Sequence, residues 1–136
     1  MSLFVDTSVW SLALRRDQAS GAPEVHALRR ALEDGDAVIT TGLILQELLQ
    51  GFAGPRARKQ IIEKFSALPL LVPDRQDHVE AADLRNRCRR AGVQIGTIEA
   101  LLAQICIRHE LTLLTTGRDF ELAASHCPLS VWKSPK

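Results

Sequence analysis

The 136-residue chain has no tyrosine, and its aromatic side chains are two tryptophans and four phenylalanines. This scarcity argues against a protein that binds single-stranded nucleic acid by stacking bases on aromatic rings. Its three cysteines, Cys88, Cys106 and Cys127, lie far apart and form no Cys-x-x-Cys pair. The sequence therefore predicts neither a disulfide framework nor a zinc site, and we expect three thiols in the hydrophobic core.

Other common signatures are also missing. The four histidines are scattered, without a His-Glu-x-x-His motif, and no nucleophile stands beside an evident base. The net charge of +1 does not indicate a polyanionic partner, so any nucleic-acid binding must come from local basic clusters. No apolar run is long enough for a membrane span, and the first residues do not resemble a signal peptide, so we expect a cytoplasmic protein.

What the chain does have is an alternation of short apolar runs with helical patterns. A hydrophobic content of 46% is enough for one core, and we expect a single domain over residues 1–136. The alternation predicts an α/β fold with a central parallel sheet covered by helices on both faces. The expected strands are 3–5, 37–39, 68–72, 111–114 and 129–132, and the expected helices are 8–16, 23–34, 43–52, 55–66, 74–91 and 97–109.

Asp6 is the most informative residue, because it follows the first expected strand and opens the first helix. Parallel sheets bind ligands at the carboxyl ends of their strands, which makes Asp6 a candidate site residue. The alternative is an ordinary helix N-cap. Three further acids, each at the edge of an expected element, favour a site: Glu47, Glu99 and Asp119.

Each of these acids also has a structural interpretation. Glu47 projects away from the apolar stripe of its helix, formed by Leu45, Leu48, Leu49 and Phe52, and is alternatively a solvated helix residue. Glu99 lies near the start of a helix that is apolar all round. With Gly96 or Thr97 as cap, it is alternatively a first-turn acid favoured by the helix dipole. Asp119 follows a strand that ends in hydroxyl residues and is alternatively the cap of a helix beginning at Phe120.

The predicted topology gathers the four acids at one end of the sheet. Clustered carboxylates repel one another, and they persist only if they share protons or bind cations. Oxygen ligands select hard ions such as Mg²⁺ or Mn²⁺, which also bind phosphate oxygens. The chemistry that follows is phosphodiester hydrolysis, in which one or two ions activate a water and stabilise the departing oxygen.

The segments that carry the acids resemble the signature blocks of PIN-domain proteins, in particular VapC toxins. They are residues 5–10, 45–51, 95–103 and 113–120, in the family's order and across nearly the whole chain. The resemblance implies a PIN-like three-layer α/β/α sandwich and a Mg²⁺- or Mn²⁺-dependent endoribonuclease. It also implies an RNA substrate, a cognate VapB-type antitoxin and a homodimer.

Carried over to this chain, the resemblance makes Asp6, Glu47, Glu99 and Asp119 the catalytic acids, with Asp6, Glu99 and Asp119 as metal ligands. Two positions depart from the family pattern. Glu99 stands where relatives usually have Asp. Gly117 stands where they often have a polar or acidic residue, which leaves Asp119 as the main acid of its block.

Several polar and basic residues are candidates for supporting roles. Thr7 and Thr115 are expected to hold metal-bound waters. Arg118, beside Asp119, is the candidate for a phosphate contact. The other basic residues, which are alternatively solvated helix faces, are Arg15, Arg16, Arg56, Arg58, Lys59, Arg85, Arg87, Arg89 and Arg90. RNA recognition is then expected to depend on RNA shape and a local loop.

Three other functions are alternatives to the nuclease. A haloacid-dehalogenase-type phosphatase needs a second Asp two residues after the first, where this chain has Ser8. A receiver-like signalling domain needs neighbouring acids and a late Lys that the sequence does not provide. The remaining alternative is a catalytically inactive PIN scaffold that acts as a protein- or RNA-binding module.

Overall fold

A central parallel sheet organises the chain, of which the computed structural model describes residues 2–15 and 21–135. The described residues form five strands in the spatial order β3-β2-β1-β4-β5. In chain order the strands are β1 (Ser2–Val5), β2 (Ala37–Thr41), β3 (Leu70–Leu71), β4 (Thr112–Leu114) and β5 (Ser130–Val131). Every pairing is parallel, which confirms the predicted α/β fold.

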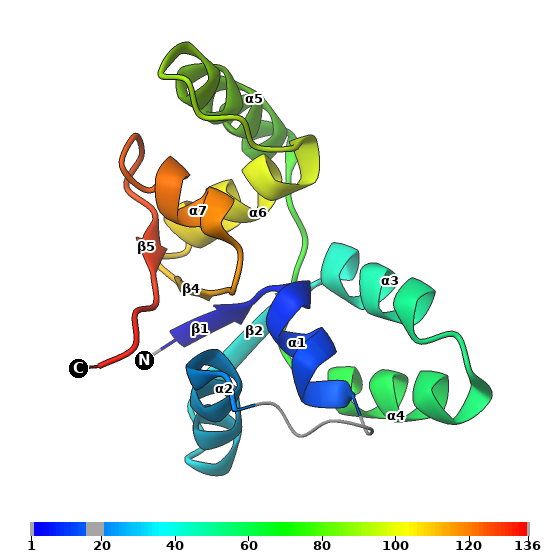
Figure 1. Ribbon diagram of the computed structural model, residues 1–136. Coiled ribbons are helices and arrows are strands. Elements are labelled where there is room, and N and C mark those ends of the chain that lie inside the picture. Colours follow the sequence, from blue (N-terminus) through cyan, green and yellow to red (C-terminus); the bar gives the residue numbers. More distant parts are fainter. Residues whose placement is uncertain (1, 16–20, 136) are drawn as a thin grey trace.

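Helices connect the strands and cover both faces of the sheet. α1 (Thr7–Leu14) and α2 (Pro23–Glu33) join β1 to β2, and α3 (Gly42–Gly51) and α4 (Pro55–Ser66) join β2 to β3. α5 (Arg75–Arg90) and α6 (Thr97–Arg108) lead back to β4, and α7 (Arg118–Ala123) leads to β5. Figure 1 shows α1 to α4 on one side of the sheet and α6 and α7 on the other, which gives three layers. In the described part of the chain, no helix is long and apolar enough to cross a membrane.

The direction in which strands are added reverses beside β1. From β1 the chain moves outward through β2 to the edge strand β3, then crosses to β4 on the other side of β1 and ends at β5. Phe4 of β1 accordingly pairs with Ile39 of β2 and with Leu113 of β4. The helices that follow β1 and β4 leave toward opposite faces, so a crevice opens at the carboxyl ends of these two strands.

The core is built on the two central strands. Phe4, Val5, Leu113 and Leu114 are each 0% exposed, because β1 and β4 have helices on both faces. α6 is buried on nearly every side, from residue 100 to residue 106, since it packs between the sheet and α5. The prediction of a buried helix around Glu99 is therefore confirmed.

The thiols lie where the sequence predicts them, with one partial exception. Cys88 and Cys106 are buried, and Cys127 is partly buried with its Sγ donating to the Ala123 carbonyl. Burial raises the pKa of the Cys106 thiol, and the negative charge of nearby Asp6 raises it further. Cys106 therefore stays protonated beneath the crevice and adds neither a nucleophile nor a thiolate ligand to it.

The two edge strands are shorter than the sequence predicts. The strands expected at 68–72 and 129–132 are reduced to Leu70–Leu71 and Ser130–Val131, because an edge strand has a single neighbour with which to pair. β2 is longer than expected and continues to Thr41, because Thr40 and Thr41 pair with β3. The first helix begins at Thr7 and ends at Leu14, and Arg16 lies outside the described residues.

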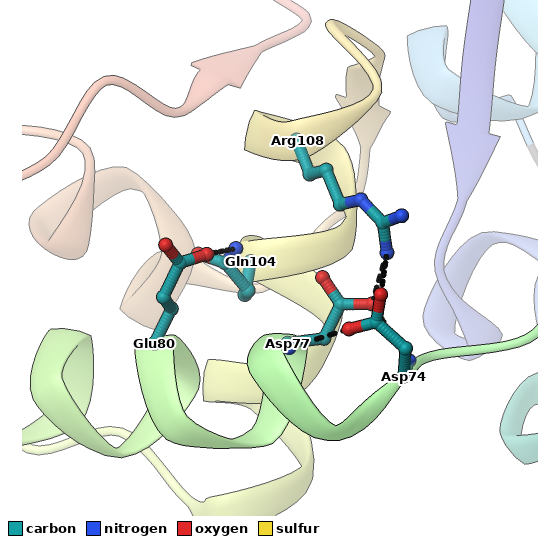
Figure 2. Close-up of polar contacts among 5 residues, drawn as sticks. All are labelled: Asp74, Asp77, Glu80, Gln104 and Arg108. Atoms are coloured by element: carbon teal, nitrogen blue, oxygen red, sulfur yellow. Dashed lines mark hydrogen bonds and ion pairs between the residues drawn. The ribbon is translucent and has the colours of Figure 1, made fainter.

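Polar contacts fix α5 against α6, the helix that carries Glu99. Figure 2 shows Arg108 of α6 reaching the first turn of α5, where Nη1 lies 2.6 Å from Asp77 Oδ2 and 3.2 Å from Asp74 Oδ2. About one turn earlier in α6, the amide of Gln104 donates to Glu80 at 2.6 Å. Arg85 Nε also donates to the Ile95 carbonyl at 2.9 Å, just before α6 begins. These contacts hold the start of α6 at a fixed place beside the crevice.

Asp77 is the buried member of this network, with a side chain only 1% exposed. It forms a capping box with Asp74, in which each backbone N–H donates to the other carboxylate at 2.9 Å. Burial acts to raise the pKa of Asp77. The N–H of Asp74, the guanidinium of Arg108 and the amide of Gln104 outweigh burial, and the pKa lies below its ordinary value of 3.8. Asp77 is therefore an ionised structural carboxylate.

Candidate active site

A pocket of about 550 Å³ occupies the crevice at the carboxyl ends of β1 and β4. It is the place where the topology predicts a ligand site. Three of the four predicted acids line it, each from a different element. The described residues that line it are Asp6, Thr7, Ser8, Glu47, Gly96, Thr97, Ile98, Glu99, Leu102, Gly117 and Phe120.

Asp6 stands between β1 and α1 and is held by two hydroxyl groups. Its Oδ2 accepts a hydrogen bond from Ser8 Oγ at 2.8 Å and another from Thr115 Oγ1 at 2.9 Å. Asp6 occupies the N-cap position of α1, but its side chain makes no cap hydrogen bond, so the interpretation as an ordinary N-cap is wrong. Within residues 2–15 and 21–135 no group donates to Oδ1, which leaves that oxygen available to a ligand.

The two hydroxyls are themselves oriented by the backbone of the β4–α7 loop. Ser8 Oγ accepts from the N–H of Thr116 at 3.1 Å, and Thr115 Oγ1 accepts from the N–H of Gly117 at 2.9 Å. Each hydroxyl has a single proton, and each gives it to Asp6. Donors from two ends of the chain therefore fix the rotamer of Asp6.

Glu47 projects from α3 into the same pocket and is exposed. Its Oε1 accepts from the hydroxyl of Thr7 at 3.0 Å, which links α3 to the start of α1. Ile44 and Leu48 are the buried residues of α3, and Leu45, Leu49 and Phe52 of the predicted apolar stripe pack partly buried against the core, while Glu47 faces away from it. The hydroxyls of Thr7 and Thr115 thus orient carboxylates, and their predicted contact with metal-bound waters stays a prediction.

Glu99 combines its two alternative roles. It lies in the first turn of α6, and its Oε1 accepts the backbone N–H of Gly96, the N-cap residue, at 2.8 Å. The predicted capping contact is therefore present. The same carboxylate also lines the pocket, and in the described residues nothing donates to its Oε2. One oxygen caps the helix, and the other has no donor among the described residues.

Asp119 is placed differently from the other three acids. α7 begins at Arg118, with Gly117 as its N-cap, so Asp119 lies inside the first turn and the prediction that it caps a helix from Phe120 is wrong. Arg118 and Asp119 are both exposed and neither lines the pocket, although Gly117 and Phe120 on either side of them do. Metal binding by Asp119 and phosphate binding by Arg118 stay predictions.

The acids lie where the strand order reverses beside β1, and the sequence matches a known protein family. A family model described as PIN domain matches residues 3–125. The chain belongs to the PIN domain family. The sandwich of helices around a five-stranded parallel sheet is the PIN fold, as the sequence resemblance implies.

Solved structures with the same fold include components of toxin–antitoxin complexes. VapBC-1 from nontypeable Haemophilus influenzae is similar with a TM-score of 0.74 and 16% identity, over 100% of both chains. FitAcB from Neisseria gonorrhoeae has a TM-score of 0.70 and 20% identity, over 97% of both chains. Mycobacterium tuberculosis VapC20, described as a sarcin-ricin loop cleaving toxin, has a TM-score of 0.67 and 19% identity, over 95% of this chain and 99% of that one. At these identities the similarity concerns the fold.

The pocket of this PIN domain offers carboxylate oxygens, the ligands that hard divalent cations prefer. Asp6, Glu47 and Glu99 each commit one oxygen to a hydrogen bond, and the described residues provide no donor for the second. No group of three or more potential ligand side chains converges closely enough to hold an ion by protein atoms alone, among the residues described. This spacing fits Mg²⁺ or Mn²⁺, because such ions keep several waters and need only one or two carboxylates.

Among residues 2–15 and 21–135, no basic side chain lines the pocket. The ion pairs in the described part of the chain join Arg108 to Asp74 and Asp77, away from the crevice. The predicted basic residues that are described are exposed, apart from the half-buried Arg85, and none of them lines the pocket. The three acids are therefore not neutralised by neighbouring side chains.

Proposed function

We propose that this PIN domain protein is a metal-dependent endoribonuclease, the toxin of a VapBC-type toxin–antitoxin pair. The observation that carries the proposal is the shared pocket of Asp6, Glu47 and Glu99, three acids from three elements that pair with no cation among the residues described. Carboxylates gathered in this way are costly for a fold unless they bind cations. Membership of the PIN family and the toxin structures of the same fold support the proposal.

Asp6 and Glu99 are the residues proposed to hold the ion, with Asp119 as an outer ligand across the β4–α7 loop. A bound Mg²⁺ or Mn²⁺ supplies a lowered pKa for an attacking water and compensation of phosphate charge. Ser8 and Thr115 keep Asp6 in one rotamer through its Oδ2. Glu47, oriented by Thr7, is placed to accept a proton from the water.

RNA is proposed as the substrate. A pocket of carboxylates repels a polyanion until cations neutralise it, so initial attraction must come from basic residues around the crevice. Arg118 is proposed for this contact, because it is exposed in the first turn of α7, next to the pocket residue Gly117. The few aromatic side chains favour recognition of RNA shape over base stacking.

A VapB-type antitoxin is the proposed partner, and a homodimer the proposed assembly, on the basis of the toxin–antitoxin complexes with this fold. A pocket that admits a divalent cation also accepts an arginine or lysine from a partner, which would pair with Asp6 or Glu99 and obstruct both RNA and metal. One such ion pair contributes little affinity, so the complex must also bury apolar surface. Excess RNA or Mn²⁺ should then relieve inhibition in vitro.

The proposal is tested by metal-dependent cleavage of a structured RNA with the purified protein. We expect cleavage with Mg²⁺ or Mn²⁺, none with EDTA, and a loss of about a hundredfold or more in Asp6→Asn, which should fold as stably as the wild type. Sequencing of the RNA ends would locate the cleavage site. Full activity of metal-replete Asp6→Asn would remove Asp6 from the site.

The rival function is an inactive PIN scaffold that only binds protein or RNA. The wide spacing of the acids favours it, since no three ligands converge in the described residues. The same assay distinguishes the two functions. RNA binding without cleavage, at any concentration of Mn²⁺ and with the antitoxin absent, would establish the scaffold and end the nuclease proposal.

A further inference from the structure

Glycine at position 96 is required by the position of the Glu99 carboxylate and not by the backbone. Gly96 has φ −74° and ψ 168°, an extended conformation that every residue adopts. A Cβ built on Gly96, however, would lie 2.7 Å from Glu99 Oε1, a distance that atoms do not tolerate. The space beside Gly96 is therefore occupied by the acid that caps it.

The same contact determines where the rest of Glu99 points. Oε1 is held by the N–H of Gly96 at 2.8 Å, which restricts a side chain with three rotatable bonds to one arrangement. In that arrangement the carboxylate lines the pocket that contains Asp6 and Glu47. A substituent at position 96 would displace the flexible end of Glu99, not the backbone, and so would move the carboxylate within the pocket.

We propose that Gly96 is a positioning residue of the active site, which leaves room for Glu99 to bind the α6 cap with one oxygen and a divalent cation with the other. The inference rests on the proposed function, because it concerns the cation site. It explains how an acid one methylene longer than the family's usual Asp serves at this position. The glutamate is folded back onto its own helix end, which holds its second oxygen at the pocket.

Gly54 provides a matched control. It is the N-cap of α4, with φ −63° and ψ 146°, and like Gly96 it offers no side chain of its own to the helix start. A Cβ at Gly54 would meet nothing within 4 Å, so Gly54→Ala changes the cap preference of a helix without displacing any side chain. Any effect shared by Gly54→Ala and Gly96→Ala is then a general effect of alanine at an N-cap.

The experiment is Mn²⁺ binding, measured by calorimetry or electron paramagnetic resonance, for wild type, Gly96→Ala and Gly54→Ala, with melting temperatures in parallel. We expect Gly96→Ala to weaken Mn²⁺ binding by about tenfold to a hundredfold, the range for losing a group that orients a ligand. Gly54→Ala should bind Mn²⁺ as the wild type does. Gly96→Ala should melt somewhat below Gly54→Ala, because displacement of Glu99 also breaks its capping bond to the Gly96 N–H. A purely structural role of the Gly96–Glu99 contact would lower the melting temperature without weakening Mn²⁺ binding.

A double-mutant cycle shows whether Gly96 acts through Glu99. In a Glu99→Ala background there is no carboxylate to displace, so adding Gly96→Ala should weaken Mn²⁺ binding no further. Unchanged Mn²⁺ affinity in Gly96→Ala, or an equal loss in both backgrounds, overturns the inference while leaving the proposed nuclease intact. A wild type that binds no Mn²⁺ and cleaves no RNA overturns the nuclease and this inference together.

Discussion

The starts of α5 and α6 contain the same local device and use it for different purposes. Each helix has an acid at its third position whose carboxylate accepts the N–H of the N-cap residue, Asp77 at 2.9 Å and Glu99 at 2.8 Å. Asp77 is 1% exposed and paired with Arg108, whereas Glu99 borders an open pocket that no basic side chain of the described residues lines. The two acids cap their helices in the same way. They differ in whether a basic side chain of the described residues pairs with them.

The difference has a physical basis. A carboxylate removed from water is retained when a cation and hydrogen bonds replace its solvation, which Arg108, Asp74 and Gln104 do for Asp77. Within the part of the chain that the structure describes, Glu99 has the helix N-terminus and its cap N–H for partners, and Asp6 and Glu47, which are also acids, line the same pocket. Asp77 is therefore paired with a protein cation through Oδ2, although its buried Oδ1 has no hydrogen-bond partner among the described residues, whereas Glu99 is proposed to be neutralised by a bound metal ion.

The largest expected effect is on the α6 side of the comparison. Glu99→Gln should reduce RNA cleavage by about a hundredfold or more, because the amide has no charge for the cation. Its melting temperature should stay close to that of the wild type, since the amide oxygen can still accept the N–H of Gly96. Single-turnover cleavage across a Mn²⁺ titration is the measurement. A full rate at limiting Mn²⁺ together with a changed melting temperature would assign Glu99 to capping alone.

Glu99→Asp sharpens the same test. Asp77 shows that an aspartate at the third position reaches its cap N–H, so the shorter acid should keep the capping bond. Its second oxygen should then lie farther from the pocket. We expect partial activity with an altered preference between Mg²⁺ and Mn²⁺, intermediate between the wild type and Glu99→Gln.

The reciprocal effect is expected on the α5 side. Asp77→Asn should lower the free energy of unfolding by about 2 kcal/mol, less than for a fully buried pair because Arg108 is 42% exposed and can still reach Asp74. Cleavage per folded molecule should be unchanged, since Asp77 does not line the pocket. Urea unfolding and the RNA assay on the same preparation measure both. A loss of activity as large as that of Glu99→Gln, without a loss of stability, would reverse the assignment.

The pH dependence of stability should follow Asp77. Its pKa is lowered in the folded state, so its charge stabilises the fold above the ordinary value of 3.8 and this stabilisation is lost as the pH falls below that value. Wild type should therefore lose stability more steeply than Asp77→Asn below about pH 4. Parallel denaturant titrations from pH 6 to pH 3 test this. Curves of equal slope would show that Asp77 is not the titrating group.

The smallest effect is expected outside both helix starts. Arg118→Gln should weaken RNA binding by a few-fold and reduce the salt dependence of binding by about one ion, because it removes one phosphate contact. Stability should not change, since Arg118 is exposed and has no ion pair in the part of the chain that the structure describes. Binding is measured with the inactive Asp6→Asn protein at several salt concentrations. An unchanged salt slope would exclude Arg118 from the RNA contact.

The sequence was most predictive where the signal is local. The alternation of apolar runs and helical patterns predicted every strand, because burial on both faces demands continuous apolar runs in β1 and β4. The expected edge strands are longer than the observed ones, because the sequence does not show where the neighbouring strand stops pairing. The acids Asp6, Glu47 and Glu99 were predicted to converge from topology alone, and they do share a pocket.

The contacts that set the role of each acid were not predictable in the same way. In the sequence, Ser8 matters only because a phosphatase would need Asp at that position, yet Ser8 and Thr115 both donate to Asp6. Thr115 lies 109 residues from Asp6 along the chain. Asp77 is not among the predicted site residues, although its spacing from Asp74, three residues earlier, is the sequence signal of a capping box. Its pairing with Arg108, 31 residues later, depends on how α5 packs against α6. Packing across elements, which one sequence does not specify, separates a structural acid from a functional one.

Calorimetric titration of Mn²⁺ into the wild type, Asp6→Asn and Asp77→Asn tests the central claim most directly. The account predicts binding to wild type and Asp77→Asn with the same affinity, and weakening of about tenfold or more in Asp6→Asn. Equal affinity of wild type and Asp6→Asn, or loss of binding in Asp77→Asn while it remains folded, would contradict it.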